Sequence, residues 1–301
     1  MYKQSLLKEY IKNTELRVYK DTINIRLNSD LAKKYDNGVY NNYLEHMYKC
    51  YLDILSLNIM LPSNAKPKLY FYIVPDENYS ELLGTPKKYD NGKGSGKPVI
   101  CYDLDGYKCA YGISTGLCEK FPSSPSVMRE ENSVHELAHL IQIQFYAKNA
   151  IISEGLAEAI PLYVMDYESI FEEHRAVLSN LGENEIYSPK EILNSEKNNS
   201  FGVISSFEGK SCSFRYSYIS SYLFVRGCLE KIVSDNNCSK RDALQYFLNL
   251  LYQNDYSFEW MIYHIADNIG VDKNNLLDSK EIQLKVIDSI KNEERNNSRS
   301  K

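Results

Sequence analysis

The stretch His135-Glu136-Leu137-Ala138-His139 decides how the rest of the chain is interpreted. On a helix, residues four positions apart lie one turn apart on the same face, so the imidazoles of His135 and His139 can reach one metal ion. Glu136 points about 100° away around the helix axis, where it can meet a metal-bound water instead of the metal. The chain has only 5 histidines among 301 residues. Chance would produce this spacing in well under about 1% of such chains.

The residues around this motif predict a helix from about Pro125 to Lys148. Projected at the helical period, the apolar residues form one stripe, and the two histidines lie on the adjoining face at the edge of a cleft. Ser124 is suited to cap this helix and Pro125 to be its first residue. The apolar stripe consists of Val134, Leu137, Ala138, Ile141 and Phe145.

A catalytic zinc ion usually has three protein ligands and leaves one position to water, so a third ligand is required. The metzincin pattern would need Gly at position 142 and His at position 145, and Gln142 and Phe145 exclude it. Glu154, fifteen positions after the second histidine, becomes the favoured ligand at the start of a second helix. Glu158, one turn further on, is placed to accept the free N–H of a ligand histidine, preferably His135, and to fix its orientation.

The two glutamates also allow simpler interpretations. The helix dipole favours a carboxylate at a helix start, which would account for Glu154 without a metal. Glu158 can equally be an ordinary surface carboxylate. Pro161 should kink or end this second helix, because proline removes a backbone hydrogen bond. The ligand at position 154 does not depend on how far the helix continues.

The motifs His135-Glu136-Leu137-Ala138-His139 and Glu154-Gly155-Leu156-Ala157-Glu158 resemble those of the gluzincin, or thermolysin-like, zinc metallopeptidases, and in particular the small bacterial peptidase MA-like domains. The resemblance extends more weakly over about residues 16 to 265. It implies that His135, His139 and Glu154 bind one Zn²⁺ per chain. It also implies that Glu136 is the catalytic carboxylate and that Glu158 supports a ligand histidine.

The expected fold is α+β and zincin-like, with two lobes and a zinc cleft between them. The N-terminal lobe, residues 1–149, would hold a small mixed sheet and the active-site helix. The C-terminal lobe, residues 150–290, would be mainly helical and carry the glutamate ligand. Residues 291–301 are polar and are expected to be a disordered tail. Local patterns predict strands at residues 22–27, 68–74, 98–102 and 110–114, and a helix over residues 40–57.

Substrate contacts are implied by the same resemblance. In that family an edge strand above the zinc pairs with the substrate backbone, and either of the last two predicted strands is a candidate. The alternative is a strand fully paired inside the sheet. Tyr216 or Tyr218, at the start of a later helix, could donate a hydrogen bond to the oxyanion. With 26 tyrosines in the chain, each of these two can instead be a core or surface residue without a catalytic role. His174 is an alternative donor.

Three further features have simpler interpretations. His46 and His264 are expected to be structural. The loop over residues 90–97 lacks the spacing of a phosphate-binding loop and is interpreted as flexible linkage. The polar stretch from Asn180 to Gly209 could form a loop or a lid over the cleft.

Composition narrows the class of protein. At 43% hydrophobic and 25% charged residues the chain is an ordinary globular protein, and a net charge of -5 gives no reason to expect nucleic acid. The sequence has neither a run of about 18 apolar residues nor the apolar core of a secretory signal. The 7 cysteines are odd in number and have no Cys-x-x-Cys pair, which favours free thiols. We expect a cytoplasmic protein, or an effector exported without a signal; the oligomeric state stays open.

These features together predict a zinc-dependent metallopeptidase acting on a peptide or protein. A zinc-activated water, with its pKa lowered from 15.7 toward about 7, would attack the scissile carbonyl. Glu136 would take the proton of this water and deliver it to the leaving amine. An endopeptidase is preferred because the Gly-x-Met-x-Asn motif of related aminopeptidases is missing. The alternatives are a zinc-binding pseudopeptidase that acts as a protein-binding module, an exported effector protease specific for one host protein, and a non-peptide amidase.

Overall fold

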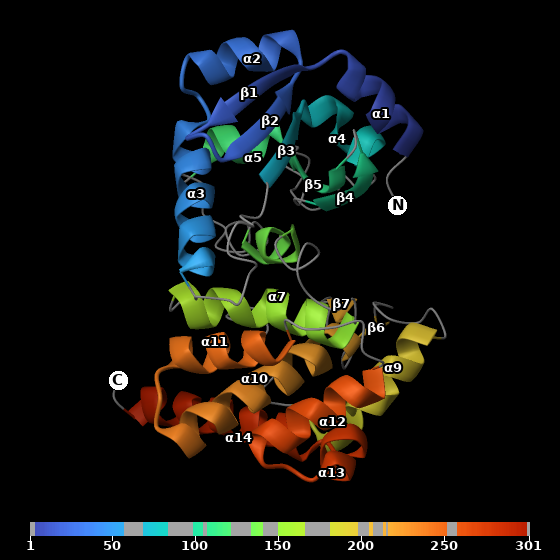
Figure 1. Ribbon diagram of the computed structural model, residues 1–301, viewed down its shortest axis with the longest axis vertical. Helices are drawn as coiled ribbons and strands as arrows, with labels where there is room; N and C mark the ends of the chain where they lie inside the picture. The colour runs from blue at the N-terminus through green and yellow to red at the C-terminus, as the bar shows by residue number, and fades with distance from the viewer. Residues whose placement is uncertain are drawn as a thin grey trace. The chain divides into compact units, whose positions relative to one another are not determined.

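The computed structural model describes residues 4–56, 69–83, 99–104, 107–121, 134–140, 150–165, 181–197, 205–206, 213–214, 216–251 and 258–299. Over these residues the fold is α+β, mostly helical with one small mixed sheet (Figure 1). The described residues up to 140 belong to one compact unit and those from 150 onward to a second. Among the described helices, none is long and apolar enough to cross a membrane.

The first unit is built on the mixed sheet, whose strands lie in the order β1-β2-β3-β5-β4. β2, β3 and β5 run parallel, whereas β1 and β4 run antiparallel to their neighbours. The four predicted strands are confirmed as β2, β3, β4 and β5, and the predicted helix over residues 40–57 as α3. In chain order the elements are α1 (Gln4–Lys12), β1 (Glu15–Tyr19), β2 (Ile23–Leu27), α2 (Ser29–Asp36), α3 (Asn41–Leu55), β3 (Leu69–Val74), α4 (Asp76–Leu83), β4 (Val99–Leu104), β5 (Tyr107–Ser114), α5 (Thr115–Lys120) and a helix over residues 134–140.

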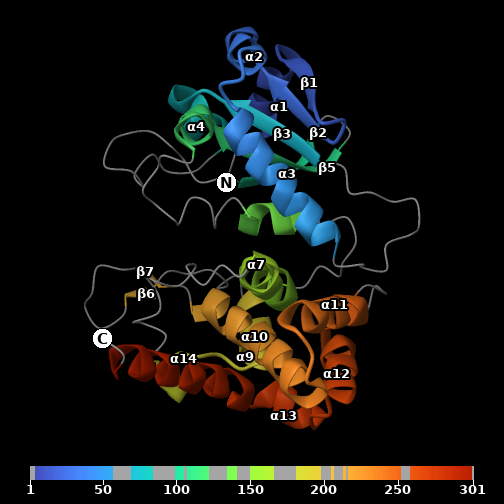
Figure 2. The ribbon, with the colours of Figure 1, turned by 90° about the vertical axis from the view of Figure 1, so that its left-hand side faces the viewer.

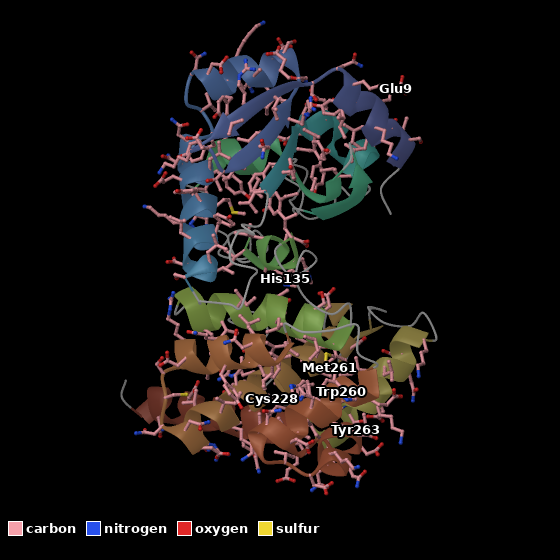
Figure 3. All side chains as sticks on the ribbon, in the orientation of Figure 1. Glu9, His135, Cys228, Trp260, Met261 and Tyr263 are labelled. Carbon is pink, nitrogen blue, oxygen red and sulfur yellow. The ribbon has the colours of Figure 1, made fainter. Side chains whose placement is uncertain are left out.

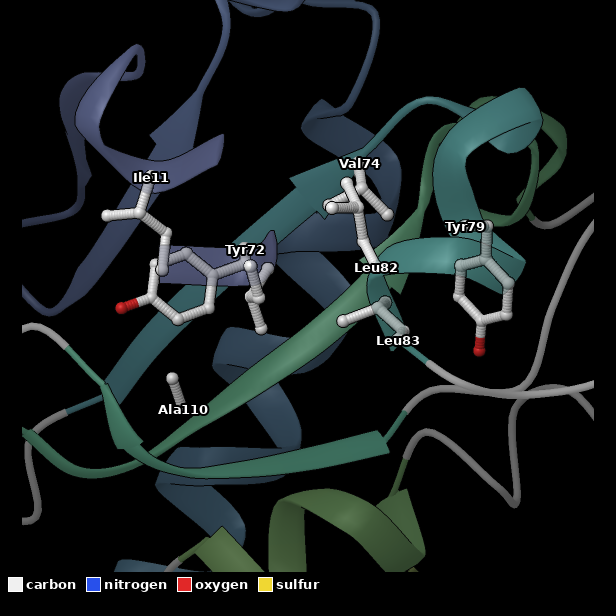
Figure 4. Packing of buried hydrophobic residues seen from close by; sticks show 8 residues of the cluster. Ile11, Tyr72, Val74, Tyr79, Leu82, Leu83 and Ala110 are labelled. Carbon is white, nitrogen blue, oxygen red and sulfur yellow. The ribbon is translucent and has the colours of Figure 1, made fainter. Parts of the chain in front are cut away.

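Helices cover both faces of this sheet (Figures 1 and 2). On one face, Tyr72 and Ala110 belong to a buried cluster with side chains of α1 and α4 (Figure 4). Their chain neighbours Phe71 and Tyr111 lie on the opposite face, because side chains alternate along a strand, and their rings stack at 4.7 Å. There the Tyr111 hydroxyl lies 2.6 Å from the hydroxyl of Tyr43 on α3. Because both faces of the sheet are buried, residues 69–74 are an apolar run in which apolar and polar residues do not alternate.

β5 is followed directly by the short helix α5, which the sequence did not predict. The Ser114 hydroxyl accepts a hydrogen bond from Leu117 N at 3.4 Å and so caps the helix. The Asp76 carboxylate accepts from Gly116 N at 2.8 Å and from the Thr115 hydroxyl at 3.3 Å. A negative charge at a helix N-terminus is favourable. This support comes from a residue far away in sequence, which is why local patterns missed α5.

The two edge strands of the sheet differ in their surroundings. On β1, the carbonyl oxygens of Leu16 and Val18 accept hydrogen bonds from Arg17 at 3.3 Å and from Tyr35 at 3.2 Å. Arg17 is held in turn by two 3.0 Å bonds to Asp36 on α2. β4 forms the opposite edge, with β5 between it and β3. Of the two strands that the sequence proposed as an edge, β5 is interior, and β4 is the edge among the strands that the structure describes.

The second unit is almost entirely helical. Two short strands, β6 and β7, pair antiparallel, and α7 packs against the long helix α10. The elements are α7 (Ala150–Met165), the 3-10 helix η3 (Glu183–Glu185), α9 (Pro189–Lys197), β6 (Ser205–Ser206), β7 (Ser213–Phe214), α10 (Tyr216–Asn236), α11 (Lys240–Leu251), α12 (Phe258–Ile269), α13 (Lys273–Asp278) and α14 (Glu281–Arg299).

Two segments of this unit are more regular than their sequences suggested. Residues 291–299, expected to be a disordered tail, form the last turns of α14, which buries Val286, Ile287 and Ile290. Within the polar stretch from 180 to 209, α9 is helical and the residues before it are anchored: Tyr187 N donates to the Ser220 hydroxyl at 2.8 Å. The loop predicted over residues 90–97 lies outside the described residues.

The four cysteines whose side chains the structure describes are free thiols, as the sequence predicts. Cys50, Cys118 and Cys228 are buried, and Cys238 is partly buried. Burial raises the pKa of the Cys118 and Cys228 thiols, because the thiolate would lose its hydration. These buried thiols are therefore packing residues in the native state.

Candidate metal centre

Residues 134–140, which carry the motif, are helical as predicted. His139 is buried with 8% of its surface exposed, whereas His135, which Figure 3 labels on this helix, is half-buried. The described members of the predicted apolar stripe are all buried, namely Val134, Leu137 and Ala138. The remaining parts of the predicted helix, residues 125–133 and 141–148, lie outside the described residues.

The imidazoles of His135 and His139 turn the same ring atom toward each other. Their Nε2 atoms lie 3.0 Å apart, and the rings are almost perpendicular at 82° with centroids 4.6 Å apart. Two nitrogens bound to one zinc ion at 2.0–2.1 Å in a tetrahedral arrangement would lie about 3.3–3.4 Å apart. The observed separation is close to that value, so the two rings have the orientation of a chelating pair.

Glu154 supplies a third donor. One ligand atom from each of His135, His139 and Glu154 lies within 4.8 Å of the other two. A group of two imidazoles and one carboxylate could hold a metal ion, and these donors suit the divalent transition metals. His139 is buried, and His135 and Glu154 are half-buried.

α7 carries Glu154 in its second turn, not at the helix start as expected, because the helix begins at Ala150. Nor does the helix end at Pro161: it continues to Met165. Proline costs one backbone hydrogen bond, but packing against neighbouring helices supplies most of the stability of a helix in a protein. Glu154 and Glu158 are both half-buried and lie one turn apart on the same face.

Gly155 allows α7 and α10 to approach each other closely. A Cβ atom at position 155 would lie 2.5 Å from the Ser221 carbonyl oxygen and 2.5 Å from a methyl group of Val225. Real Cβ contacts are essentially never this short. Glycine is therefore required at this position by packing, in addition to its place in the motif. The contact fixes the turn of α7 that carries Glu154 against α10.

Tyr216 and Tyr218 both lie in the first turn of α10. Their side chains lie outside the described part of the structure, as does His174, so their roles as oxyanion donors stay predictions. The role of Glu158 also stays a prediction. The two histidines expected to be structural each contact an aromatic ring. The ring centroids of His46 and Phe121 lie 4.8 Å apart, and His264 stacks on Trp260 with ring centroids 4.9 Å apart.

Sequence reasoning missed a polar network on α10. Arg226 donates through Nη1 to the Tyr222 hydroxyl at 3.1 Å and through Nε to Glu230 at 2.6 Å. Tyr222 is fully buried, and only 15% of the Arg226 side chain is exposed. Burial raises the pKa of Tyr222, although Arg226 acts in the opposite direction. The spacing of four residues between Tyr222, Arg226 and Glu230 is the signal that could have found this network.

Comparisons with known proteins do not assign this chain to a family. No protein-family model matches the chain, and no curated protein matches it. What the site can do chemically follows from its donors: two facing imidazoles, a carboxylate at Glu136 between them in sequence, and a further carboxylate at Glu154.

Proposed function

We propose that the protein is a zinc-dependent metallopeptidase of the gluzincin type, in which His135, His139 and Glu154 bind one Zn²⁺. The observation that carries the proposal is the 3.0 Å approach of the two histidine Nε2 atoms on a helix that also bears Glu136. Structural zinc sites are closed by four protein ligands, whereas two histidines and one glutamate leave a position for water, as in thermolysin and carboxypeptidase A. The donor set therefore favours a catalytic site over a structural one.

The reaction that fits these residues is hydrolysis of an amide bond. When bound, Zn²⁺ would polarise the scissile carbonyl and lower the pKa of a water ligand to about 7. Glu136 follows His135 in the chain but projects about 100° around the helix from it, so its carboxylate can meet the attacking water. It accepts one proton as the water oxygen bonds to the carbonyl carbon, and it donates that proton to the amine nitrogen as the C–N bond breaks.

β4 is the strand that we propose for binding the substrate backbone. Among the strands that the structure describes it is an edge of the sheet, and on the other edge strand the carbonyls of Leu16 and Val18 accept side-chain hydrogen bonds. An extended peptide can add to a sheet edge through main-chain hydrogen bonds. Because such an edge accepts a chain that continues in both directions, this binding mode favours an endopeptidase. Tyr216 or Tyr218 would donate to the oxyanion.

The experiment that tests this function compares wild-type protein with Glu136→Gln on a diverse peptide library. New peptide termini are identified by mass spectrometry, and the zinc content of both proteins is measured on the same samples. We expect one zinc per chain in both proteins and cleavage by the wild type only. A wild-type protein that holds zinc but cleaves no peptide of the library would contradict a peptidase of broad specificity and would favour an effector protease specific for one protein, a pseudopeptidase or an amidase for non-peptide substrates.

A further inference from the structure

We propose that Tyr222 is a positioning residue for the metal site. In this proposal the network of Glu230, Arg226 and Tyr222 on α10 continues through the Tyr222 hydroxyl to Glu158 on α7. Glu158 is thereby held in the orientation in which it accepts the N–H of a ligand histidine. The inference rests on the proposed function, because a positioned Glu158 matters only if a metal binds beside it.

Glu158 and Tyr222 both lie within one turn of the contact between the two helices. α7 meets α10 where Gly155 lies against Ser221 and Val225. Glu158 is one turn after Gly155 on α7, and Tyr222 directly follows Ser221 on α10. Glu158 is half-buried and Tyr222 fully buried, as expected for side chains at the margin and in the centre of a helix contact.

The hydrogen-bond capacity of Tyr222 supports the same link. A phenol hydroxyl can accept and donate, and the Tyr222 oxygen accepts from Arg226 at 3.1 Å, which leaves its own proton to be donated. A buried hydroxyl almost always finds an acceptor. Glu158 on the facing helix is such an acceptor; burial is the main cause of the raised pKa of Tyr222, and the negative charge of Glu158 adds to it.

Arg226 explains why this arrangement can persist in a buried position. Its guanidinium donates to Glu230 at 2.6 Å and to Tyr222 at 3.1 Å, so the buried positive charge has a carboxylate partner and a second acceptor. A buried charge is tolerated only when it is paired and hydrogen-bonded in this way. Glu230, with 33% of its side chain exposed, lies at the end of the network nearest to solvent.

The consequence for the metal follows from the role of groups that hydrogen-bond to ligands. A carboxylate that holds a ligand histidine fixes its tautomer and orientation, and losing such a partner typically lowers metal affinity about 10–100-fold. Tyr222 would act one step further from the metal, through Glu158. Its loss should therefore have a smaller effect than the loss of Glu158, and no effect once Glu158 has been removed.

The test measures zinc affinity by competition with a chelator in the full-length protein. The proteins compared are the wild type, Tyr222→Phe, Glu158→Gln and the double variant, with Tyr79→Phe as the control for loss of a buried phenol in the first unit, where 2% of Tyr79 is exposed. We expect Glu158→Gln to weaken zinc binding about 10–100-fold and Tyr222→Phe to weaken it severalfold. The double variant should match Glu158→Gln alone, and Tyr79→Phe should match the wild type.

Two results would overturn the inference while leaving the proposed function intact. One is wild-type zinc affinity in Tyr222→Phe; the other is a double variant whose loss equals the product of the two single losses. A wild-type protein that binds no zinc would overturn the proposed function as well. If Tyr222→Phe does not fold, Glu230→Gln at the solvent end of the network provides the same test, since unchanged zinc affinity in that variant also contradicts the proposal.

Discussion

Gly155 on α7 lies so close to Ser221 on α10 that a β-carbon at position 155 would stand 2.5 Å from the Ser221 carbonyl oxygen. The neighbouring residue in the chain is Glu154, which belongs to the group of three possible metal ligands. The packing of two helices and the placing of a donor therefore depend on the same turn of α7. A substitution that disturbs the packing of α7 against α10 should therefore also displace the carboxylate of Glu154.

Gly155→Ala should destabilise the protein and weaken metal binding. Forcing an extra methyl group into a close-packed contact typically costs about 1–3 kcal/mol, which exceeds the roughly 1 kcal/mol that alanine gains over glycine in a helix. The free energy of unfolding from urea titration would show the loss. Gly182→Ala is the matched control, since a Cβ there would lie 3.5 Å from Glu185, an ordinary contact. Equal stability of both variants and the wild type would contradict the packing argument.

Substitutions at the metal centre should separate metal binding from turnover. His135→Ala, His139→Ala and Glu154→Ala each remove a donor and should lose zinc, as measured by the metal content of purified protein. Glu136→Gln keeps the three donors but cannot accept a proton, so it should retain zinc and lose hydrolysis. Retention of zinc by all three alanine variants would show that the ligand assignment is wrong.

The hydrogen bond between Tyr43 and Tyr111 should be visible in a double-mutant cycle. Their hydroxyls lie 2.6 Å apart in the buried contact between α3 and β5. Tyr43→Phe or Tyr111→Phe removes this hydrogen bond, and each should lower the free energy of unfolding by about 0.5–1.5 kcal/mol. The double variant should lose less than the two single losses combined, because neither hydroxyl then remains. Strict additivity would mean that the two groups do not interact.

Acid should weaken the contact that holds the β1–β2 turn to α3. The Glu45 carboxylate accepts from Lys20 at 2.6 Å and from the Tyr19 hydroxyl at 2.8 Å, and these bonds lower the pKa of Glu45 below its ordinary value of 4.5. Stability from a lowered carboxyl pKa is present above the ordinary value and is lost as the pH falls through the folded value.

The wild type should therefore be more stable than Glu45→Gln at neutral pH, and the difference in urea midpoint should shrink at acid pH. Glu9→Gln, at an exposed carboxylate of α1, is the control for the same substitution outside this contact. A difference between wild type and Glu45→Gln that stays constant across the acid range would mean that the charge of Glu45 does not support the contact.

The parts of the fold that could be predicted are those with a local sequence period. The apolar run of β3 and the alternating pattern of β2 follow from burial on both faces and from alternating burial along the strand. The facing histidines could also be predicted, because a spacing of four residues on a helix fixes their geometry regardless of the rest of the chain.

The parts that could not be predicted depend on residues distant in sequence. α5 begins where the Asp76 carboxylate accepts from Gly116, and α7 continues past Pro161 while packing against α10. The tyrosine and arginine of the α10 network have a helical spacing that is visible in the sequence, but their burial depends on the fold. The requirement for Gly155 likewise becomes clear only when Ser221 is placed beside it.

The side chains along β1 have a consequence for how copies of this chain meet. Leu16 and Val18 are 45% and 47% exposed. Exposed apolar side chains on an edge strand favour pairing with the edge strand of a second copy. Arg17 and Tyr35 already occupy two of its carbonyl groups, and charged side chains at a sheet edge are a common protection against aggregation. The described part of the sheet thus has one edge strand, β1, whose charged side chain and occupied carbonyl groups protect it against pairing with a second copy.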